Sequence, residues 1–261
     1  MVRWGSSVQS RLPAQIGILH FVKIIFFDTE TTGGGEKDRL VSLAVKERAV
    51  EAPIVNALYK PPMPIPIESM MIHHITDKMV AEKPSFTESE DYKKLKALFE
   101  NSDTIGVAHN ASFDIAMLAR EGITPLNFIC TYKVAAALDP EEKIGTYKLQ
   151  YLRYYLGLEV EALAHDALGD VLVLELLFER LLSKMSVQKG TEVAALEEMI
   201  RISSQPRLFT TLRFGKHSGK KIEDLARTDP GYLEWLLAEK KKKPYGEEDW
   251  IYTIEHYLKA H

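Results

Sequence analysis

The sequence contains a single cysteine, Cys130, among its 261 residues, so no disulfide can form within the chain. It therefore gives no sign of a disulfide-stabilised domain from an oxidising compartment. It also has no apolar run close to the ~20 residues that a membrane-spanning helix needs. The formal net charge of −4 is small and argues weakly against a broad, sequence-blind binder of polyanions. We expect a cytoplasmic protein with no membrane partner.

Acidic residues are missing from the first 27 positions, and residues 1–21 are mildly basic. This segment lacks the continuous apolar stretch of a secretory signal. We interpret residues 1–21 as a disordered extension. An organelle transit peptide is the alternative, supported only by Arg3 and Arg11.

The remaining composition, 46% hydrophobic and 27% charged, suits a globular protein with a real core. Val22–Phe27 is a continuous β-prone run that predicts a strand buried on both faces. Further strands are predicted at 39–46, 54–59, 104–108 and 128–131, and helices at 85–100, 112–121, 132–138, 148–156 and 167–185. Strands that alternate with helices after an opening meander indicate an α/β domain with a mixed sheet.

The pattern changes after residue 185. Residues 186–206 are rich in Gln, Lys, Gly and Ser, and we interpret them as a linker around a short helix near 193–202. Residues 207–261 carry 11 Lys and Arg against 9 Asp and Glu, whereas residues 1–206 carry 22 Lys and Arg against 28 Asp and Glu. This small basic module contains a turn, Phe214–Lys221, that either contacts phosphates or is simply a solvated turn. Its expected core residues are Leu225, Tyr232, Trp235 and Leu236.

Two carboxylates follow the first buried strand. Asp28 and Glu30 are two residues apart, so on an extended strand their side chains point to the same face. Together they have the oxygen ligands that a hard cation such as Mg²⁺ requires. A solvated strand end followed by a turn explains the same residues equally well.

Two more acids lie at expected helix starts. Asp114 falls in the first turn of the 112–121 helix, with Ser112 as its expected cap, and Asp170 falls early in the 167–185 helix. His165 precedes that helix on a loop. An acid in a first turn also interacts favourably with the helix dipole, so each acid alone has an ordinary structural explanation. Four acids at one point, however, would repel each other strongly without cations, and a pair of cations is a known solution for phosphoryl displacement.

Three motifs carry a resemblance to a known family. The segments DTETTG (28–33), HNASFD (109–114) and HDALGD (165–170) resemble the three motifs of the DEDDh branch of DnaQ-like 3′→5′ exonucleases. The resemblance covers about residues 22–185. It implies a ribonuclease-H-like fold with a central mixed sheet.

The resemblance also implies roles for the motif residues. Asp28 would bridge two divalent cations, Mg²⁺ or Mn²⁺, and Glu30 and Asp170 would complete the site that activates water. Asp114 would hold the second cation, directly or through water. His165 would be the general base, a role that suits an imidazole with an ordinary pKa of about 6.5.

Substrate contacts are implied for five residues around these motifs: Thr31, Thr32, His73, Asn110 and Phe113. Thr31 and Thr32 resemble the turn that approaches a terminal 3′-hydroxyl. His73 lies in the segment MMIHHITDKMV, which resembles the stretch that lines the terminal-nucleotide pocket. A buried, satisfied histidine is an equal alternative for His73.

The segment from Arg207 to Leu237 resembles the C-terminal region of the exodeoxyribonuclease X group. The expected function is therefore metal-dependent 3′→5′ hydrolysis of DNA ends, single-stranded or duplex, with release of nucleoside 5′-monophosphates. Two alternatives stay open. The first is the same chemistry on RNA ends, which stays open because no motif reports whether the protein contacts a 2′-hydroxyl. The second is an inactive module that binds strand ends.

Overall fold

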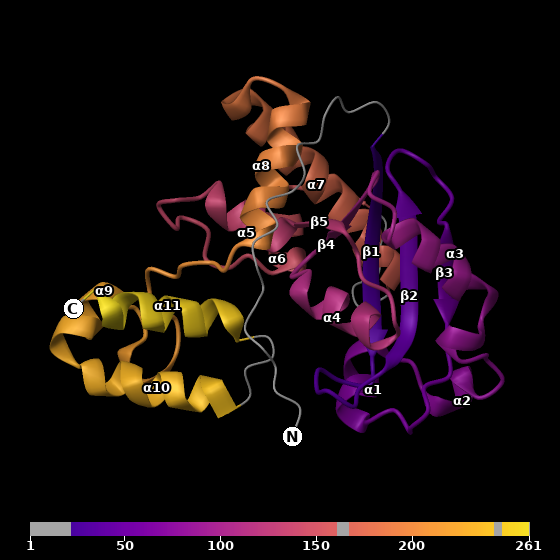
Figure 1. Ribbon diagram of the computed structural model, residues 1–261, viewed down its shortest axis with the longest axis horizontal. Helices are drawn as coiled ribbons and strands as arrows, with labels where there is room; N and C mark the ends of the chain where they lie inside the picture. Colours follow the sequence, from indigo (N-terminus) through magenta and orange to yellow (C-terminus); the bar gives the residue numbers. More distant parts are fainter. Residues whose placement is uncertain (1–21, 161–166, 243–246, 261) are drawn as a thin grey trace.

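A five-stranded mixed sheet forms the centre of the protein (Figure 1). The structure is a computed structural model and describes residues 22–160, 167–242 and 247–260. The strands lie in the order β3-β2-β1-β4-β5 and span β1 (Lys23–Thr31), β2 (Leu40–Glu47), β3 (Val55–Leu58), β4 (Thr104–Ala108) and β5 (Asn127–Cys130). The predicted α/β class and mixed sheet are confirmed.

The strand directions determine where the motif residues gather. β1 and β2 are antiparallel, as are β2 and β3, whereas β4 is parallel to β1 and β5 is parallel to β4. The carboxyl ends of β1, β4 and β5 therefore share one edge of the sheet. The pairing of β1 with β2 shifts register between Glu30 and Thr31, a type of irregularity that is common beside active sites.

Most helices of the sheet-containing region lie where the sequence predicted helices, but the two short helices before residue 85 were not predicted. The helices are α1 (Ile67–His73), α2 (Asp77–Val80), the 3₁₀ turn η1 (Phe86–Glu88), α3 (Glu90–Phe99), α4 (Ser112–Arg120), α5 (Thr131–Ala137), α6 (Leu149–Tyr155), α7 (Ala167–Lys189) and α8 (Glu192–Ser204). The predicted 85–100 helix begins only at Glu90, after the 3₁₀ turn. The expected cap Ser112 is wrong: Ala111 is the cap residue, and Ser112 is the first helical residue.

Apolar residues cover both faces of the sheet, as the continuous run in β1 predicted. On one face, Phe26 contacts Phe178 of α7 edge-on with 5.3 Å between ring centroids. On the other face, Phe27 contacts Phe99 of α3 at 4.9 Å. Helices α5 to α8 pack on the first face, and α3 and α4 on the second.

The interpretation of residues 186–206 as a linker needs correction. Helix α7 continues to Lys189, and α8 begins three residues later. The apolar side of α8, with Ala195, Leu196 and Met199, is buried in the same core cluster as β1 and α7. The polar composition of residues 186–206 led to the wrong interpretation, because the polar side chains lie on the solvent side of a helix whose other side is packed in the core.

The C-terminal region forms a hydrophobic cluster of its own. It contains the 3₁₀ turn η2 (Gly215–His217) and the helices α9 (Ile222–Thr228), α10 (Pro230–Lys242) and α11 (Glu248–Lys259), which lie together beside the sheet-containing body in Figure 1. Leu225 and Leu236 are buried there as expected. Trp235 is not a core residue, because 55% of it is exposed. That this region is an independent domain stays a prediction.

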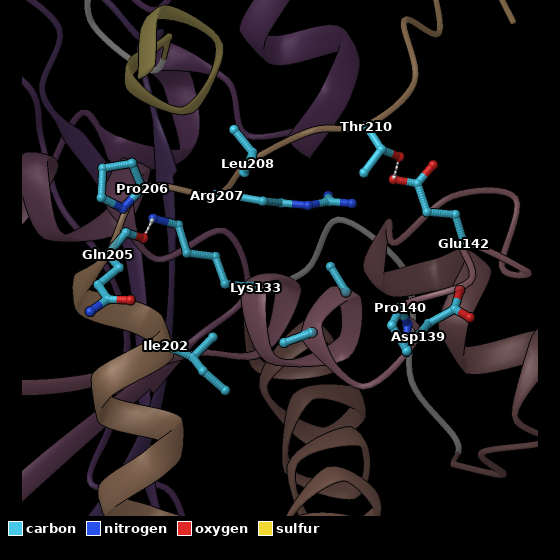
Figure 2. A pocket seen from close by; sticks show the side chains of 12 residues that line it. Lys133, Asp139, Pro140, Glu142, Ile202, Gln205, Pro206, Arg207, Leu208 and Thr210 are labelled. Atoms are coloured by element: carbon cyan, nitrogen blue, oxygen red, sulfur yellow. Dashed lines mark hydrogen bonds between the residues drawn. The ribbon is translucent and has the colours of Figure 1, made fainter. Parts of the chain in front are cut away.

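Polar and aromatic contacts join the two regions, and Figure 2 shows polar contacts among the residues at this junction. A cavity of about 260 Å³ at this junction is lined in part by Lys133, Glu142 and Arg207. The Arg207 guanidinium lies 4.9 Å from the ring of Tyr147 and 4.7 Å from that of Phe209. The Lys133 ammonium donates to the Gln205 carbonyl, and the Thr210 hydroxyl donates to the Glu142 carboxylate.

Candidate active site

Three carboxylates meet at the edge of the sheet where β1 ends. One oxygen from each of Asp28, Glu30 and Asp170 lies within 4.8 Å of the others. Asp28 and Glu30 share a face of β1, because successive side chains of a strand alternate between faces. Asp170 is buried in the first turn of α7. The structure thus brings together three of the four acids that the sequence singled out.

Asp114 approaches β1 from the other side. The residue is 3% exposed, and its Oδ1 accepts two hydrogen bonds, from the Thr29 backbone N–H at 3.1 Å and the Thr29 hydroxyl at 2.7 Å. Burial raises the pKa of Asp114 to about 7, although the two bonds from Thr29 oppose the shift. Asp114 is therefore fixed against the residue between Asp28 and Glu30, but it does not join the group of three.

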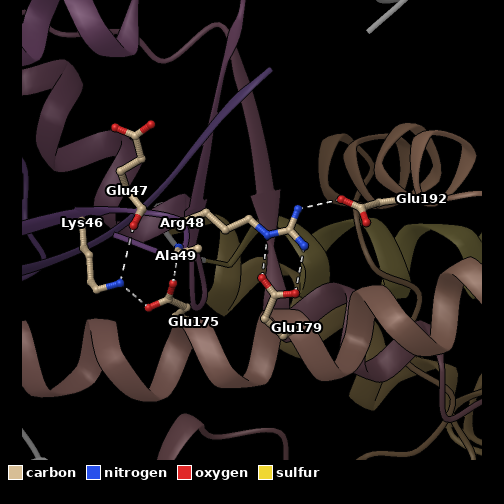
Figure 3. Close-up of polar contacts among 7 residues, drawn as sticks. All are labelled: Lys46, Glu47, Arg48, Ala49, Glu175, Glu179 and Glu192. Carbon is tan, nitrogen blue, oxygen red and sulfur yellow. Dashed lines mark hydrogen bonds and ion pairs between the residues drawn. The ribbon is translucent and has the colours of Figure 1, made fainter. Parts of the chain in front are cut away.

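Contacts from β2 and α6 fix the position of α7. The Gln150 side-chain amide donates to Oδ1 of Asp170 at 2.6 Å. Figure 3 shows two basic residues at the end of β2 that pair with the same helix: Lys46 with Glu175 at 2.5 Å, and Arg48 with Glu179 at 2.6 Å. Arg48 also pairs with Glu192 of α8.

His165 lies outside the described residues, in the segment that joins α6 to α7. Its role as general base accordingly stays a prediction.

The hydroxyls of Thr31 and Thr32 hold the loop after β1. Thr31 Oγ1 donates to the Gly33 carbonyl at 2.9 Å, and Thr32 Oγ1 donates to the Asp38 carboxylate at the same distance. Both threonines are buried. Thr32 Oγ1 also accepts the Arg39 backbone N–H, so its side chain is occupied in keeping the loop folded.

His73 lines a cavity of about 800 Å³ that also contains Glu30. Its Nδ1 accepts the Ile75 backbone N–H at 3.0 Å, while its buried Nε2 has no hydrogen-bond partner in the described part of the chain. Burial lowers the pKa of His73 and favours the neutral ring. The structure therefore does not show a fully satisfied histidine here.

Asn110 and Phe113 lie in the turn between β4 and α4. Asn110 has a positive φ of 62°, a conformation that asparagine adopts more readily than most residues. Its carbonyl accepts the Phe113 backbone N–H at 3.0 Å. The Phe113 ring faces Gly34, where an added Cβ would lie 3.6 Å away. Phe113 thus packs against the glycine-rich loop that follows β1.

Two residues at the site were not anticipated from the sequence. Thr29 binds Asp114, and Gln150 binds Asp170. Thr29 lies inside the first motif, yet its side chain points away from the neighbouring acids, so only the fold reveals its partner. Gln150 lies in an ordinary amphipathic segment with no signal of its own.

The donor set fits a hard divalent cation. Three carboxylates with oxygens within 4.8 Å of one another would repel each other without a positive charge between them. Oxygen donors are the ligands that Mg²⁺ and Mn²⁺ prefer.

Comparison with known proteins decides the family. The family model described as "Exonuclease" matches residues 25–178, which contain all three motifs. The chain belongs to this exonuclease family. A second model, "Exodeoxyribonuclease X-like C-terminal", matches residues 212–241. The predicted family and enzyme class are confirmed.

Similar proteins extend the match over most of the chain. Exodeoxyribonuclease 10 of Escherichia coli K12 is 34% identical over 237 residues, covering 88% of this chain and 96% of that protein. The DNA polymerase III subunit epsilon of Treponema pallidum is 35% identical over 175 residues, covering 63% and 78%. A solved structure of exonuclease X with 5′-overhanging duplex DNA is 28% identical, with a TM-score of 0.54, and covers 69% of this chain and 99% of that one.

No helix in the described ranges is long and apolar enough to cross a bilayer.

Proposed function

We propose that the protein is a 3′→5′ exodeoxyribonuclease that releases nucleoside 5′-monophosphates with the help of two divalent cations. The cluster of Asp28, Glu30 and Asp170, with oxygens within 4.8 Å of one another, carries this proposal. It lies at the end of the sheet, next to the His73 cavity, where a strand terminus can enter. Two Mg²⁺ or Mn²⁺ ions would neutralise the phosphate and lower the pKa of the attacking water.

Each motif residue has a defined task in this proposal. Asp28, Glu30 and Asp170 hold the cations at the end of β1, and Asp114 completes the set from α4. His165 accepts the proton of the attacking water, for which neutral imidazole is suited near pH 7. The terminal nucleotide is surrounded by five residues: His73 through its Nε2, Thr31, Thr32, Asn110 and Phe113.

DNA is the proposed substrate because a sequence similarity and a structural similarity agree. A relative that matches almost its entire length is an exodeoxyribonuclease. The exonuclease X structure, which aligns over 99% of its own chain, is bound to duplex DNA with a 5′ overhang. Such a duplex has a recessed 3′ end, which is the end that this enzyme would shorten.

The test uses 5′-labelled DNA and RNA of identical sequence, single-stranded and duplex, with Mg²⁺ and with EDTA. We expect DNA to shorten stepwise from its 3′ end in Mg²⁺ only, with mononucleotides as the product. Faster hydrolysis of RNA would overturn the substrate assignment. Shortening in EDTA would overturn the role of the cations.

Substitutions in the cluster test whether the nuclease activity depends on its carboxylates. Asp28→Asn and Asp170→Asn should each remove most activity, and the double variant should lose little more, because residues that act as one unit are not additive. Glu51→Gln makes the same charge change at an exposed residue and should retain activity. His165→Ala should lower turnover by about 10²–10⁴-fold while it spares cation binding.

A further inference from the structure

Three tyrosines lie exposed on α6, beside the carboxylate cluster. Tyr151, Tyr154 and Tyr155 are 41%, 76% and 53% exposed, whereas Leu152 of the same helix is fully buried. The rings of Tyr151 and Tyr155 are stacked, with centroids 5.9 Å apart and planes 16° from parallel. Exposed apolar side chains that are contiguous, rather than scattered singly, mark binding surfaces.

Tyr154 is connected to the active site through Arg153 and Gln150. Its amide nitrogen donates to Asp170, and its Oε1 accepts from Arg153 at 3.4 Å. The Arg153 guanidinium in turn lies 5.5 Å from the centre of the Tyr154 ring. Tyr154 follows Gln150 by one helical turn, so the two side chains are neighbours on the helix surface. The aromatic surface therefore begins directly beside the carboxylate cluster.

The charge around α6 indicates what this surface binds. Helix α6 and its cap residue carry Lys148 and Arg153 and no Asp or Glu. Lys143, farther upstream, is paired with Glu141 at 2.7 Å, and Glu159 follows the helix. An aromatic surface whose own helix and cap residue carry two cations and no acid suits a polyanion that carries flat rings. An apolar protein segment would gain nothing from these cations, whereas a nucleic-acid strand uses both features.

We propose that Tyr151, Tyr154 and Tyr155 form a stacking surface for the bases of the DNA strand that enters the active site, upstream of the terminal nucleotide. This inference rests on the proposed function. Stacking accepts every base, because each base has a π face, so the surface holds a strand without selecting a sequence. Neither the carboxylates nor the His73 cavity supplies such contacts, because both act on the strand terminus.

The test compares the full-length protein with a triple Tyr→Ala variant and a triple Tyr→Phe variant at these positions. Tyr252→Ala is the control, because Tyr252 is 43% exposed on α11, outside the site. The value of kcat/KM is measured on a thymidine dinucleotide and on a longer oligothymidylate, with Mg²⁺. Binding of the fluorescent oligothymidylate is measured in EDTA at several salt concentrations.

The ratio of kcat/KM on the long substrate to that on the dinucleotide should fall at least about tenfold in the Tyr→Ala variant. It should stay near the parent value in Tyr→Phe and Tyr252→Ala, since rings rather than hydroxyls carry the contact. Oligonucleotide binding should weaken while its salt dependence is unchanged, because stacking releases no counterions.

Three results would overturn the inference. The first is an unchanged ratio in the Tyr→Ala variant. The second is an equal loss in Tyr→Phe, which would assign the effect to the hydroxyls. The third is a reduced salt dependence of binding, which would assign it to disturbed cations. A parent protein that hydrolyses neither substrate would instead refute the proposed function, so the two failures are distinguishable.

Discussion

Thr29 donates two hydrogen bonds to one oxygen of Asp114, from its backbone N–H at 3.1 Å and its hydroxyl at 2.7 Å. The contact links α4 to the strand that carries Asp28 and Glu30. Burial raises the pKa of Asp114, and the two hydrogen bonds from Thr29 oppose this shift by stabilising the charged carboxylate. Thr29 therefore positions Asp114 from the face of β1 opposite to Asp28 and Glu30.

Replacing Thr29 with valine removes the hydroxyl and keeps the shape of the side chain. Under the proposed role of Asp114 in holding a cation, loss of its partner should cost about 10–100-fold in metal affinity or activity, so we expect the Mg²⁺ concentration for half-maximal activity to rise by about tenfold or more. Thr29→Ser retains the hydroxyl and should stay close to the parent. Equal Mg²⁺ requirements in the parent and Thr29→Val would separate Thr29 from the site.

The sequence predicted that four acids meet at one site, and the structure brings Asp28, Glu30 and Asp170 together while Asp114 lies apart. A buried strand that ends in two acids, and a helix that begins with a third, define positions at one edge of a sheet before any contact is known. The partners of those acids were not predictable. Thr29 binds Asp114 across 85 residues, and Gln150 reaches Asp170 from a different helix. Such pairings depend on how the helices pack.

The ion pair of Lys46 with Glu175 should contribute strongly to stability. Lys46 is 4% exposed, and the Glu175 side chain also accepts the Ala49 backbone N–H. Lys46→Met leaves Glu175 without its main partner in a largely buried place, so we expect a loss of about 3–5 kcal/mol in urea unfolding. A double variant, Lys46→Met with Glu175→Gln, should recover part of the loss.

Lys23→Met is the matched control for Lys46→Met. The pair of Lys23 with Glu47 has side chains that are 41% and 34% exposed, and exposed pairs contribute no more than about 1 kcal/mol. Similar losses in Lys23→Met and Lys46→Met would contradict the importance of burial.

His109 should make the stability of the protein depend on pH. Burial lowers its pKa to about 4, and its ring contacts the Thr131 hydroxyl and the Tyr147 carbonyl. The unfolded chain takes up this proton near pH 6.5 and the folded protein only near pH 4. The contribution is therefore fully present above pH 6.5, declines as the pH falls and is constant below about pH 4.

The measurement compares the unfolding free energy of the parent with that of His109→Gln in EDTA. The difference should shrink by roughly 3 kcal/mol from pH 7 to pH 4. Asp114 titrates with the opposite sign, since its raised pKa favours the folded state at low pH, but it is present in both proteins and cancels. A difference that is independent of pH would show that His109 keeps an ordinary pKa when folded.

The basic turn of the C-terminal region permits a sharper prediction than the sequence alone. Lys216 pairs with Asp229 at 3.2 Å and lies over the Tyr232 ring, so it is engaged within the region. Lys220 and Lys221 are exposed. If they contact phosphates, replacing both with alanine should reduce the salt slope of duplex binding by about two units without a change in melting temperature. An unchanged slope would assign the turn a packing role.

The last prediction concerns where the chain can be shortened. A boundary near Met185, which the linker composition suggested, would remove α8 and expose the core that Leu196 and Met199 fill. It would also remove the Ser203 hydroxyl, which accepts the backbone N–H of Cys130 at the end of β5. A protein that ends at Met185 should therefore show little near-ultraviolet circular dichroism. One that ends at Gln205 keeps α8 and should give a cooperative unfolding transition and degrade short single strands in Mg²⁺.

The protein that ends at Gln205 still lacks Arg207 and its contacts with Tyr132 and Tyr147, so its melting temperature should lie below that of the full chain. Arg207→Ala in the full-length protein isolates this part of the loss. If the protein ending at Met185 proved as cooperative as the one ending at Gln205, α8 would be dispensable to the core, and the linker interpretation would hold after all.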